Sequence, residues 1–138
     1  MKKYENFCRA LDNLKEGAQM PEPYSVVIRT GIVALFEICF EQSWKLMKEI
    51  LEYHGRTERK TGSPREIIKI AYQCGIISDH DEWLSLLETR NILSHTYSDE
   101  DSLTAIKLIK DIYVSLFDDM KKTIDIDWLP EFFSETNT

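Results

Sequence analysis

The stretch VVIRTGIVALFEICF, residues 26–40, decides the fold of this chain. Its apolar residues lie almost all the way round a helical wheel, which is typical of a helix surrounded by other helices. The amphipathic WKLMKEILEY that follows should form the more exposed half of the same helix. Together the two stretches predict one long helix over about 23–54, with Gly55 as its end.

The segments on both sides of this helix also carry the apolar spacing of helices, and alternating strand patterns are absent. We expect further helices over about 2–16, 64–75, 80–95 and 99–122. Ser63 with Glu66, and Asp79 with Glu82, form the capping-box pattern at two of the predicted starts. Since only a few residues separate the last two helices, these should be antiparallel neighbours.

The predicted fold class is all-α, an antiparallel up-and-down bundle of four to five helices. Its core is expected from the helices at 23–54, 80–95 and 99–122. A chain of 138 residues has the size of one domain. We assign the bundle to residues 1–123 and an acidic, aromatic tail to residues 124–138.

Composition narrows the classes of function. The net charge of −7 argues against a protein that coats nucleic acid by bulk charge, so DNA is not an expected partner, although a local RNA site stays open. No membrane association is expected, because the most apolar run, GIVALF, is far shorter than the roughly 20 residues of a membrane span. Cys8, Cys39 and Cys74 lack metal-like spacing and indicate reduced thiols in a cytoplasmic protein. We expect neither a metal nor a cofactor.

The fourth predicted helix ends in the polar stretch RNILSHTY, residues 90–97. At roughly 100° per residue, Arg90 falls in the middle of the leucine-rich face of that helix. A guanidinium in such a place is costly unless it is paired. Glu37 and Glu41, one turn apart on the long helix, are candidate partners, and Lys45 would relieve their mutual repulsion. An ion pair of the core and a functional site are both consistent with Arg90.

His95 lies on a different face from Arg90 but one turn after Asn91, so both groups could point into one cleft at the helix end. A histidine at a helix end more often does no more than interact with the last carbonyls. Glu37 and Glu41 resemble an acid–base pair, but two carboxylates on one helix are more often structural.

Two motifs give the chain a family resemblance. Arg90, a polar residue directly after it, and His95 after four intervening residues resemble the motif of the HEPN superfamily of small helical bundles. Tyr97, two positions later, matches the toxin form of that motif. The stretch FEICFEQSWK, residues 36–45, resembles a segment of one subgroup, the nucleotidyltransferase substrate-binding proteins. These are the HEPN halves of toxin–antitoxin pairs, and the match covers nearly the whole chain.

The resemblance implies a metal-independent endoribonuclease that works as a homodimer with both motifs in one cleft. Arg90, Asn91 and His95 would be its catalytic residues, supported by Glu37 and Glu41. A histidine can exchange protons near neutral pH, and an arginine offers a planar fork of donors to phosphate oxygens. The resemblance also implies a partner, a minimal nucleotidyltransferase acting as antitoxin, which would transfer AMP from ATP to Tyr97.

Two alternatives stay open beside the ribonuclease. The older name of the subgroup implies a non-catalytic subunit that presents a substrate to the nucleotidyltransferase. A helical adaptor with a degenerate site is the third hypothesis, so the sequence is consistent with an enzyme and with a binding module. The basic residues of the loop at 56–65 belong to neither motif. They are interpreted as a solvated loop, with a site for RNA phosphates as the alternative.

Overall fold

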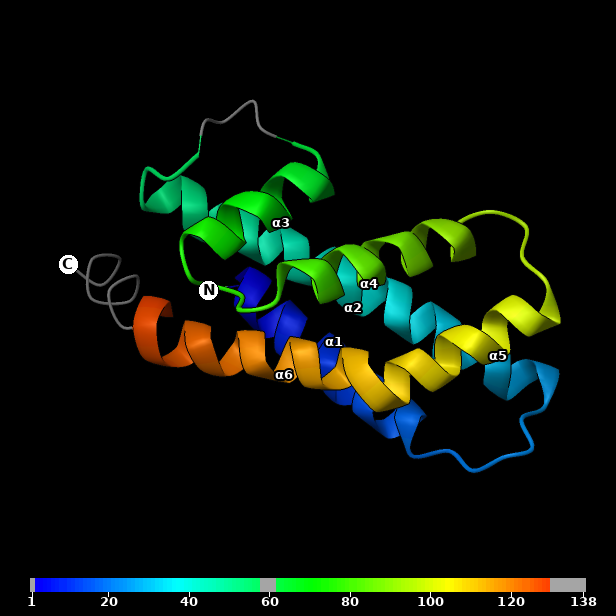
Figure 1. Ribbon diagram of the computed structural model, residues 1–138. Helices are drawn as coiled ribbons and strands as arrows, with labels where there is room; N and C mark the ends of the chain where they lie inside the picture. The colour runs from blue at the N-terminus through cyan, green and yellow to red at the C-terminus, as the bar shows by residue number, and fades with distance from the viewer. Residues whose placement is uncertain (1, 58–61, 130–138) are drawn as a thin grey trace.

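The computed structural model describes residues 2–57 and 62–129, and the regular elements among them are all helices (Figure 1). The first four are α1 (Lys2–Ala18), α2 (Val26–Tyr53), α3 (Pro64–Gln73) and α4 (His80–Leu93). A single uninterrupted helical path follows, made of α5 (Asp99–Leu108), the π-helical turn η1 (Ile109–Tyr113), α6 (Val114–Thr123) and the π-helical turn η2 (Ile124–Trp128). The predicted all-α bundle is confirmed.

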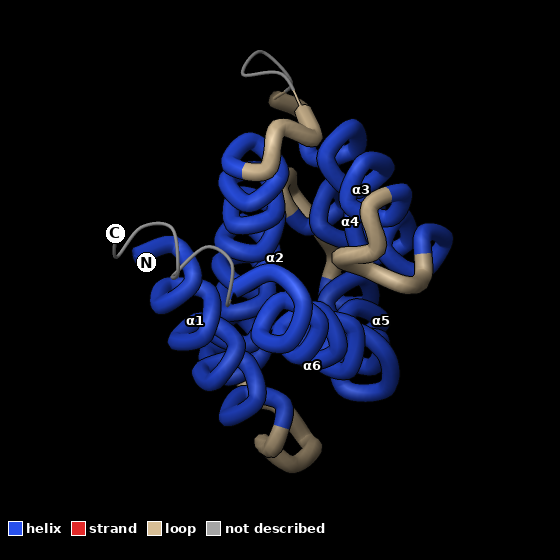
Figure 2. Tube along the Cα trace, turned by 90° about the vertical axis from the view of Figure 1, so that its left-hand side faces the viewer, coloured by secondary structure: helices blue, strands red, loops and turns tan. Residues whose placement is uncertain are grey.

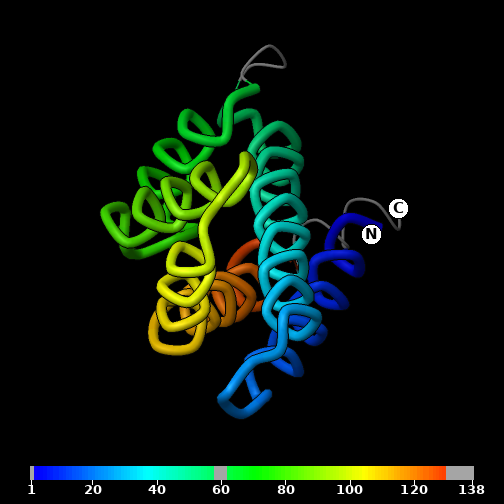
Figure 3. The backbone as a smooth tube through the Cα atoms, turned by 90° about the vertical axis from the view of Figure 1, so that its right-hand side faces the viewer, coloured from blue at the N-terminus to red at the C-terminus, as the bar shows by residue number. Residues whose placement is uncertain are grey.

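The long helix α2 is the central element, because α1, α3, α4 and α5 all pack against it. Figure 2 shows α1 on one side of α2 and the pair α3 and α4 on the other, with α5 and α6 closing the bundle. Figure 3 shows the same order around α2 from the opposite side. The chain reverses direction between α4 and α5, as the short connection predicted (Figure 1).

Side-chain caps set where the helices begin. The caps predicted at Ser63 and Asp79 are present, and each side chain accepts a hydrogen bond from the backbone N–H three residues later. Ser25 caps α2 in the same way, so this helix begins later than predicted. Ser98 begins α5 in a complete capping box, which was not predicted from the sequence.

Two helices end on glycines that adopt left-handed backbone. Gly55 follows α2 with φ 68°, and Gly75 follows α3 with φ 83°. Residues with a Cβ atom rarely adopt this conformation, whereas glycine adopts it without steric cost. Gly55 therefore ends α2 as predicted, and Gly75 ends α3 in the same way.

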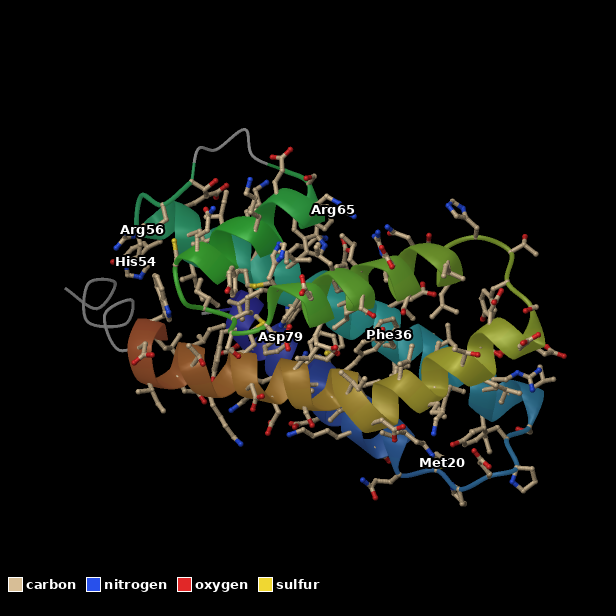
Figure 4. All side chains as sticks on the ribbon, viewed as in Figure 1. Met20, Phe36, His54, Arg56, Arg65 and Asp79 are labelled. Carbon is tan, nitrogen blue, oxygen red and sulfur yellow. The ribbon has the colours of Figure 1, made fainter. Side chains whose placement is uncertain are left out.

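The core also includes α1, which was not among the three helices predicted to form it. Phe7, Leu11 and Leu14 of this helix are buried. Phe7 packs edge-on against Phe117 of α6, with the ring centroids 6.3 Å apart. Because α1 packs along α2 and also contacts α6, its apolar face closes one side of the bundle. Phe36 of α2 lies in the middle of the molecule (Figure 4).

A partly buried group of hydroxyls joins α4 to the turn η1. The ring of Tyr113, the last residue of η1, stacks on Phe36 with centroids 5.6 Å apart. Its hydroxyl is hydrogen-bonded to that of Thr89 at 2.8 Å and to that of Ser85 at 3.1 Å. Because the three hydroxyls satisfy one another, this polar group is compatible with the surrounding apolar core.

The helical path continues past the predicted end of the bundle. Ile124 begins η2 directly after α6 and is buried. Trp128 packs edge-on against His54, which follows the end of α2, with the ring centroids 5.0 Å apart. The start of the predicted tail is therefore helical, and residues 130–138 lie outside the described residues. Among the described helices, none has the length and apolar character needed to cross a bilayer.

Candidate active site

The helix α4 ends at Leu93, two residues earlier than predicted, because Ser94 caps it. The N–H of Ser94 donates to the carbonyl of Arg90 at 3.0 Å, and its hydroxyl donates to the carbonyl of Asn91 at 2.8 Å. His95 consequently lies in the link that leads to α5. The motif is thus divided between the last turn of α4 and the start of this link.

Arg90 reaches from α4 across to α2. Its side chain is 30% exposed, and Nη2 lies 3.5 Å from Oε2 of Glu41. Nη1 donates to Oδ1 of Asn91 at 3.1 Å, and the guanidinium carbon lies 5.5 Å from the centre of the Phe40 ring. This last distance is within the range of a cation–π contact. Because a guanidinium has five N–H donors and these two hydrogen bonds engage two of them, donors remain for a phosphate.

Glu41 is held by more groups than the predicted Arg90 and Lys45. The indole N–H of Trp44 donates to Oε2 of Glu41 at 3.0 Å, and Nζ of Lys45 lies 3.2 Å from Oε1. Burial would raise the pKa of Glu41, but the hydrogen bonds from Trp44 and Lys45, together with the charges of Lys45 and Arg90, outweigh it and lower that pKa. Glu41 is therefore a stable anion between three donors. Trp44 was not predicted to belong to this group, although it lies in the quoted stretch 36–45.

Glu37, one turn earlier on α2, responds in the opposite direction. Burial raises its pKa, and the nearby charge of Arg90 offsets only part of that rise. Two neighbouring carboxyls whose pKa values move apart form the pattern of an acid–base pair. The pKa of Glu37 is therefore shifted upward and that of Glu41 downward, although the two carboxyls lie one turn apart on the same helix.

The remaining motif residues differ in exposure. His95 is exposed, whereas Tyr97 is half-buried and packs partly against the core. Within residues 62–129, no hydrogen bond or ion pair joins His95 to Arg90 or Asn91. A single chain therefore brings Arg90, Asn91 and Glu41 together and leaves His95 in the adjacent link.

Metal-ligating side chains do not gather in the described part of the chain. Among those residues, no three or more His, Cys, Asp or Glu side chains are grouped so that they could hold a metal ion. The three cysteines are free. Burial raises the pKa of the Cys39 thiol, which disfavours its reactive thiolate.

One further histidine and the basic residues of the loop at 56–65 lie away from the end of α4. His80 begins α4 and packs against Tyr72, with the ring centres 5.4 Å apart. Arg56 and Arg65 are exposed on either side of the segment 58–61 (Figure 4). The other two members of the predicted basic group, Arg59 and Lys60, lie outside the described residues.

Comparison with known proteins shows the family through its sequence. Residues 2–125 match the family model of "nucleotidyltransferase substrate binding protein like" chains. A protein of Haemophilus influenzae, named probable ribonuclease HepT, is 30% identical over 86 residues, which are 61% of this chain and 59% of the relative. The match thus spans about three fifths of the length of this curated relative.

Two solved structures share the fold. A protein from Thermus thermophilus is 28% identical and superposes with a TM-score of 0.74, covering 83% of this chain and 94% of its own. The tri-AMPylated HEPN toxin of Shewanella oneidensis, solved in complex with an MNT antitoxin, superposes with a TM-score of 0.75. Its identity is 14%, over 91% of this chain and 96% of the toxin, so this likeness shows the HEPN-like fold alone.

Proposed function

The chain belongs to the family of nucleotidyltransferase substrate binding protein-like chains, and from this premise we propose that it is a HEPN-type toxin subunit that cleaves RNA. The probable ribonuclease from Haemophilus influenzae and the toxin from Shewanella oneidensis support the toxin family. The observation that carries the proposal is the position of Arg90, half-exposed at the end of α4, loosely held by Glu41 and close in the chain to His95.

The residues present fit cleavage of RNA by proton transfer and charge stabilisation. The reaction needs a base for the 2′-hydroxyl proton, an acid for the leaving oxygen and a cation for the phosphorane. His95 has the exposure and the residue type for a proton role near neutral pH. The spare donors of Arg90 would bind the phosphate, and Asn91 would orient that guanidinium through the bond at 3.1 Å.

A second copy of the chain would supply a second histidine, and α2 carries a face on which it could pack. Val27, Gly31, Ala34 and Ile38 follow one another at helical spacing along the outward side of α2 and are all exposed. Val27 is 80% and Ile38 52% exposed. Ile38 lies one turn before Glu41, so a two-fold pairing over this row would bring the two Arg90 clusters toward one another.

Cleavage is tested with the purified chain and RNA in the presence of a chelator. The wild type should cut RNA, and His95→Ala should lose the activity while keeping its melting temperature. His80→Ala is the matched control, because His80 lies at the opposite end of α4. Equal cleavage by wild type and His95→Ala would refute the role of His95.

The composite site is tested by mixing two inactive variants. If each site takes its arginine from one chain and its histidine from the other, Arg90→Ala and His95→Ala should regain activity when they are combined. At equal mixing about half of the dimers are mixed, and the shared cleft of each holds one intact Arg90 and one intact His95, so the regained activity should stay below about half of the wild-type value. Light scattering that finds only monomer at micromolar concentration would exclude this arrangement.

Regulation is proposed to act on Tyr97, through transfer of AMP from ATP by a partner nucleotidyltransferase. The added phosphate would compete with RNA for Arg90, and the half-buried ring would need to turn outward first. Intact mass and peptide mapping after incubation with the transferase, ATP and magnesium test this. Tyr97→Phe should take up no AMP, whereas Tyr72→Phe, which changes an exposed tyrosine of α3, should behave as wild type.

The second candidate function is a non-catalytic subunit that presents a substrate to the transferase. The position of His95 outside α4, without a bond to Arg90 in the described part of the single chain, favours it. The two functions differ in the cleavage assay. If no RNA is cut at any chain concentration while the transferase binds, the subunit function is the correct one.

A further inference from the structure

Glu41 connects Arg90 to a second group of side chains further along α2. Its Oε2 accepts from both Arg90 and Trp44, at 3.5 and 3.0 Å, and its Oε1 lies 3.2 Å from Lys45. One carboxylate therefore joins the proposed phosphate-binding arginine to an indole and to a lysine. Lys48 continues the same side of the helix, one turn beyond Trp44.

Trp44, Lys45 and Lys48 line a hollow on the surface between α2 and the beginning of α1. Its volume is about 340 Å³, and it is lined by Lys3, Trp44, Lys45, Lys48, Glu49 and Glu52. Trp44 is half-buried and packs against the core, so the indole is a fixed wall of the hollow. The three lysines come from two different helices, which gives the hollow cations on more than one side.

Sites that bind single-stranded nucleic acid commonly combine an aromatic ring with flexible, positively charged side chains around it. Bases stack on aromatic side chains, while lysines contact the phosphates without fixing a sequence. An acidic peptide would use the lysines but leave the indole without a role. The composition of the hollow therefore favours a nucleotide over an acidic peptide.

We propose that Trp44, Lys45, Lys48 and Lys3 form a subsite for single-stranded RNA that holds the nucleotide next to the phosphate bound by Arg90. The inference rests on the proposed function and names where the RNA strand lies. Lys48 lies seven positions after Glu41 on the helix, roughly 10 Å along the axis, so the subsite lies within reach of a strand bound at Arg90. Glu41 marks the border between the two sites and would repel a phosphate placed between them.

The test measures binding separately from cleavage, by the anisotropy of a labelled single-stranded oligoribonucleotide in the full-length His95→Ala chain. Trp44→Leu should weaken binding roughly tenfold, and Trp44→Phe, which keeps an aromatic ring, should restore most of the affinity. Lys48→Gln should lower the slope of log K against log salt by about 0.7, the value for one lost phosphate contact on a single strand.

Matched controls exist elsewhere on the chain. Lys107 forms an ion pair with Asp111, four residues later, as Lys45 does with Glu41, four residues earlier. The side chain of Lys107 is 80% exposed. Lys107→Gln should leave affinity and salt slope unchanged, whereas Lys45→Gln should lower both. Trp128→Leu, at a half-buried tryptophan that packs on His54, controls for the loss of an indole as such. Thermal unfolding identifies any variant that fails to fold.

The outcomes distinguish this inference from the proposed function. If the wild type never cuts RNA but the Trp44 and Lys48 variants lose binding, the subsite stands and the catalytic proposal fails. If the wild type cuts RNA and these variants bind as the Lys107 control does, the subsite is overturned. Failure of His95→Ala to bind any oligoribonucleotide also overturns it. The inference is also overturned if the Trp44 and Lys48 variants lose binding to the nucleotidyltransferase but bind RNA as before. The hollow would then be a surface for that partner.

Discussion

Two polar groups involve adjacent residues of α4, Thr89 and Arg90, and differ in burial and in the length of their polar contacts. The hydroxyls of Thr89, Ser85 and Tyr113 are linked at 2.8 and 3.1 Å, with Tyr113 buried and the other two residues partly buried. Arg90, the next residue, is half-exposed and lies 3.5 Å from Glu41. Short hydrogen bonds to a buried tyrosine help to fix the position of a helix, whereas a long, partly exposed ion pair can open for a ligand. The hydroxyl group thus anchors α4, and the arginine remains available.

The largest effect is expected from removal of the whole Tyr113 side chain. Tyr113→Ala would leave a cavity beside Phe36 and two unpaired hydroxyls on α4. By analogy with other buried aromatic residues, we expect a loss of about 3–5 kcal/mol in the free energy of unfolding. Urea unfolding measures it. A loss below about 1 kcal/mol would show that Tyr113 does not anchor α4.

A smaller effect is expected when only the hydroxyl is removed. Tyr113→Phe keeps the ring on Phe36 but leaves Thr89 and Ser85 without their partner, which should cost about 1–2 kcal/mol. Thr89→Val should cost less in the Tyr113→Phe background than in the wild type, because the partner is already gone. Additive losses in this double-mutant cycle would mean that the hydroxyls do not act together.

Arg90→Met should change stability by less than about 1 kcal/mol, because the ion pair is long and solvent-accessible. Methionine keeps an unbranched apolar side chain at this position while removing the guanidinium that lies over the Phe40 ring. Cleavage of RNA should nevertheless be lost under the proposed function. If Arg90→Met destabilises the chain as much as Tyr113→Phe does, the contrast between the two groups is wrong, and Arg90 is a structural residue.

The smallest effects concern the two carboxyls and should have opposite signs. A lowered pKa in the folded state means that Glu41 adds stability above its unfolded-state pKa, which is lost as the pH falls through the folded value. A raised pKa means that Glu37 adds stability only at low pH, which is lost as the pH rises through the folded value. At neutral pH, Glu41→Gln should therefore lower the melting temperature, and Glu37→Gln should maintain or raise it.

Melting curves between about pH 3 and 7 test this pair of variants. The acid-induced fall in melting temperature should become shallower in Glu41→Gln and steeper in Glu37→Gln, relative to the wild type. Equal slopes in both variants would show that the two carboxyls do not have distinct environments.

The sequence predicted those parts of the fold that local chemistry determines. Ser63, Asp79, Gly55 and Gly75 set helix ends through their own backbone or side chain, so their effect was visible in the pattern. The pairing of Arg90 with Glu41 was also accessible, because an arginine on an apolar face requires a partner and few acidic residues lie on the neighbouring helix.

The rest depends on how distant segments pack. The bond between Tyr113 and Thr89 needs the relative rotation of α4 and η1, and no spacing within either segment specifies it. The role of α1 in the core was missed for the same reason, although the apolar face of that helix was visible. Trp44 could have been found, since it lies three residues after Glu41 on the same helix and tryptophan carries a single N–H donor.

The π-helical turn at Ile109–Tyr113 has a consequence for insertions and deletions in the last helical path. Each residue of an α-helix advances roughly 100° around the axis, so removing Ser115 from α6 would rotate Phe117 and all later core residues away from the bundle. A π-helical turn holds one residue more than the α-helical turns around it. Deleting Asp111 should therefore convert the turn to α-helix and leave the apolar faces of α5 and α6 pointing into the bundle. In thermal unfolding, the chain that lacks Asp111 should be far more stable than the chain that lacks Ser115.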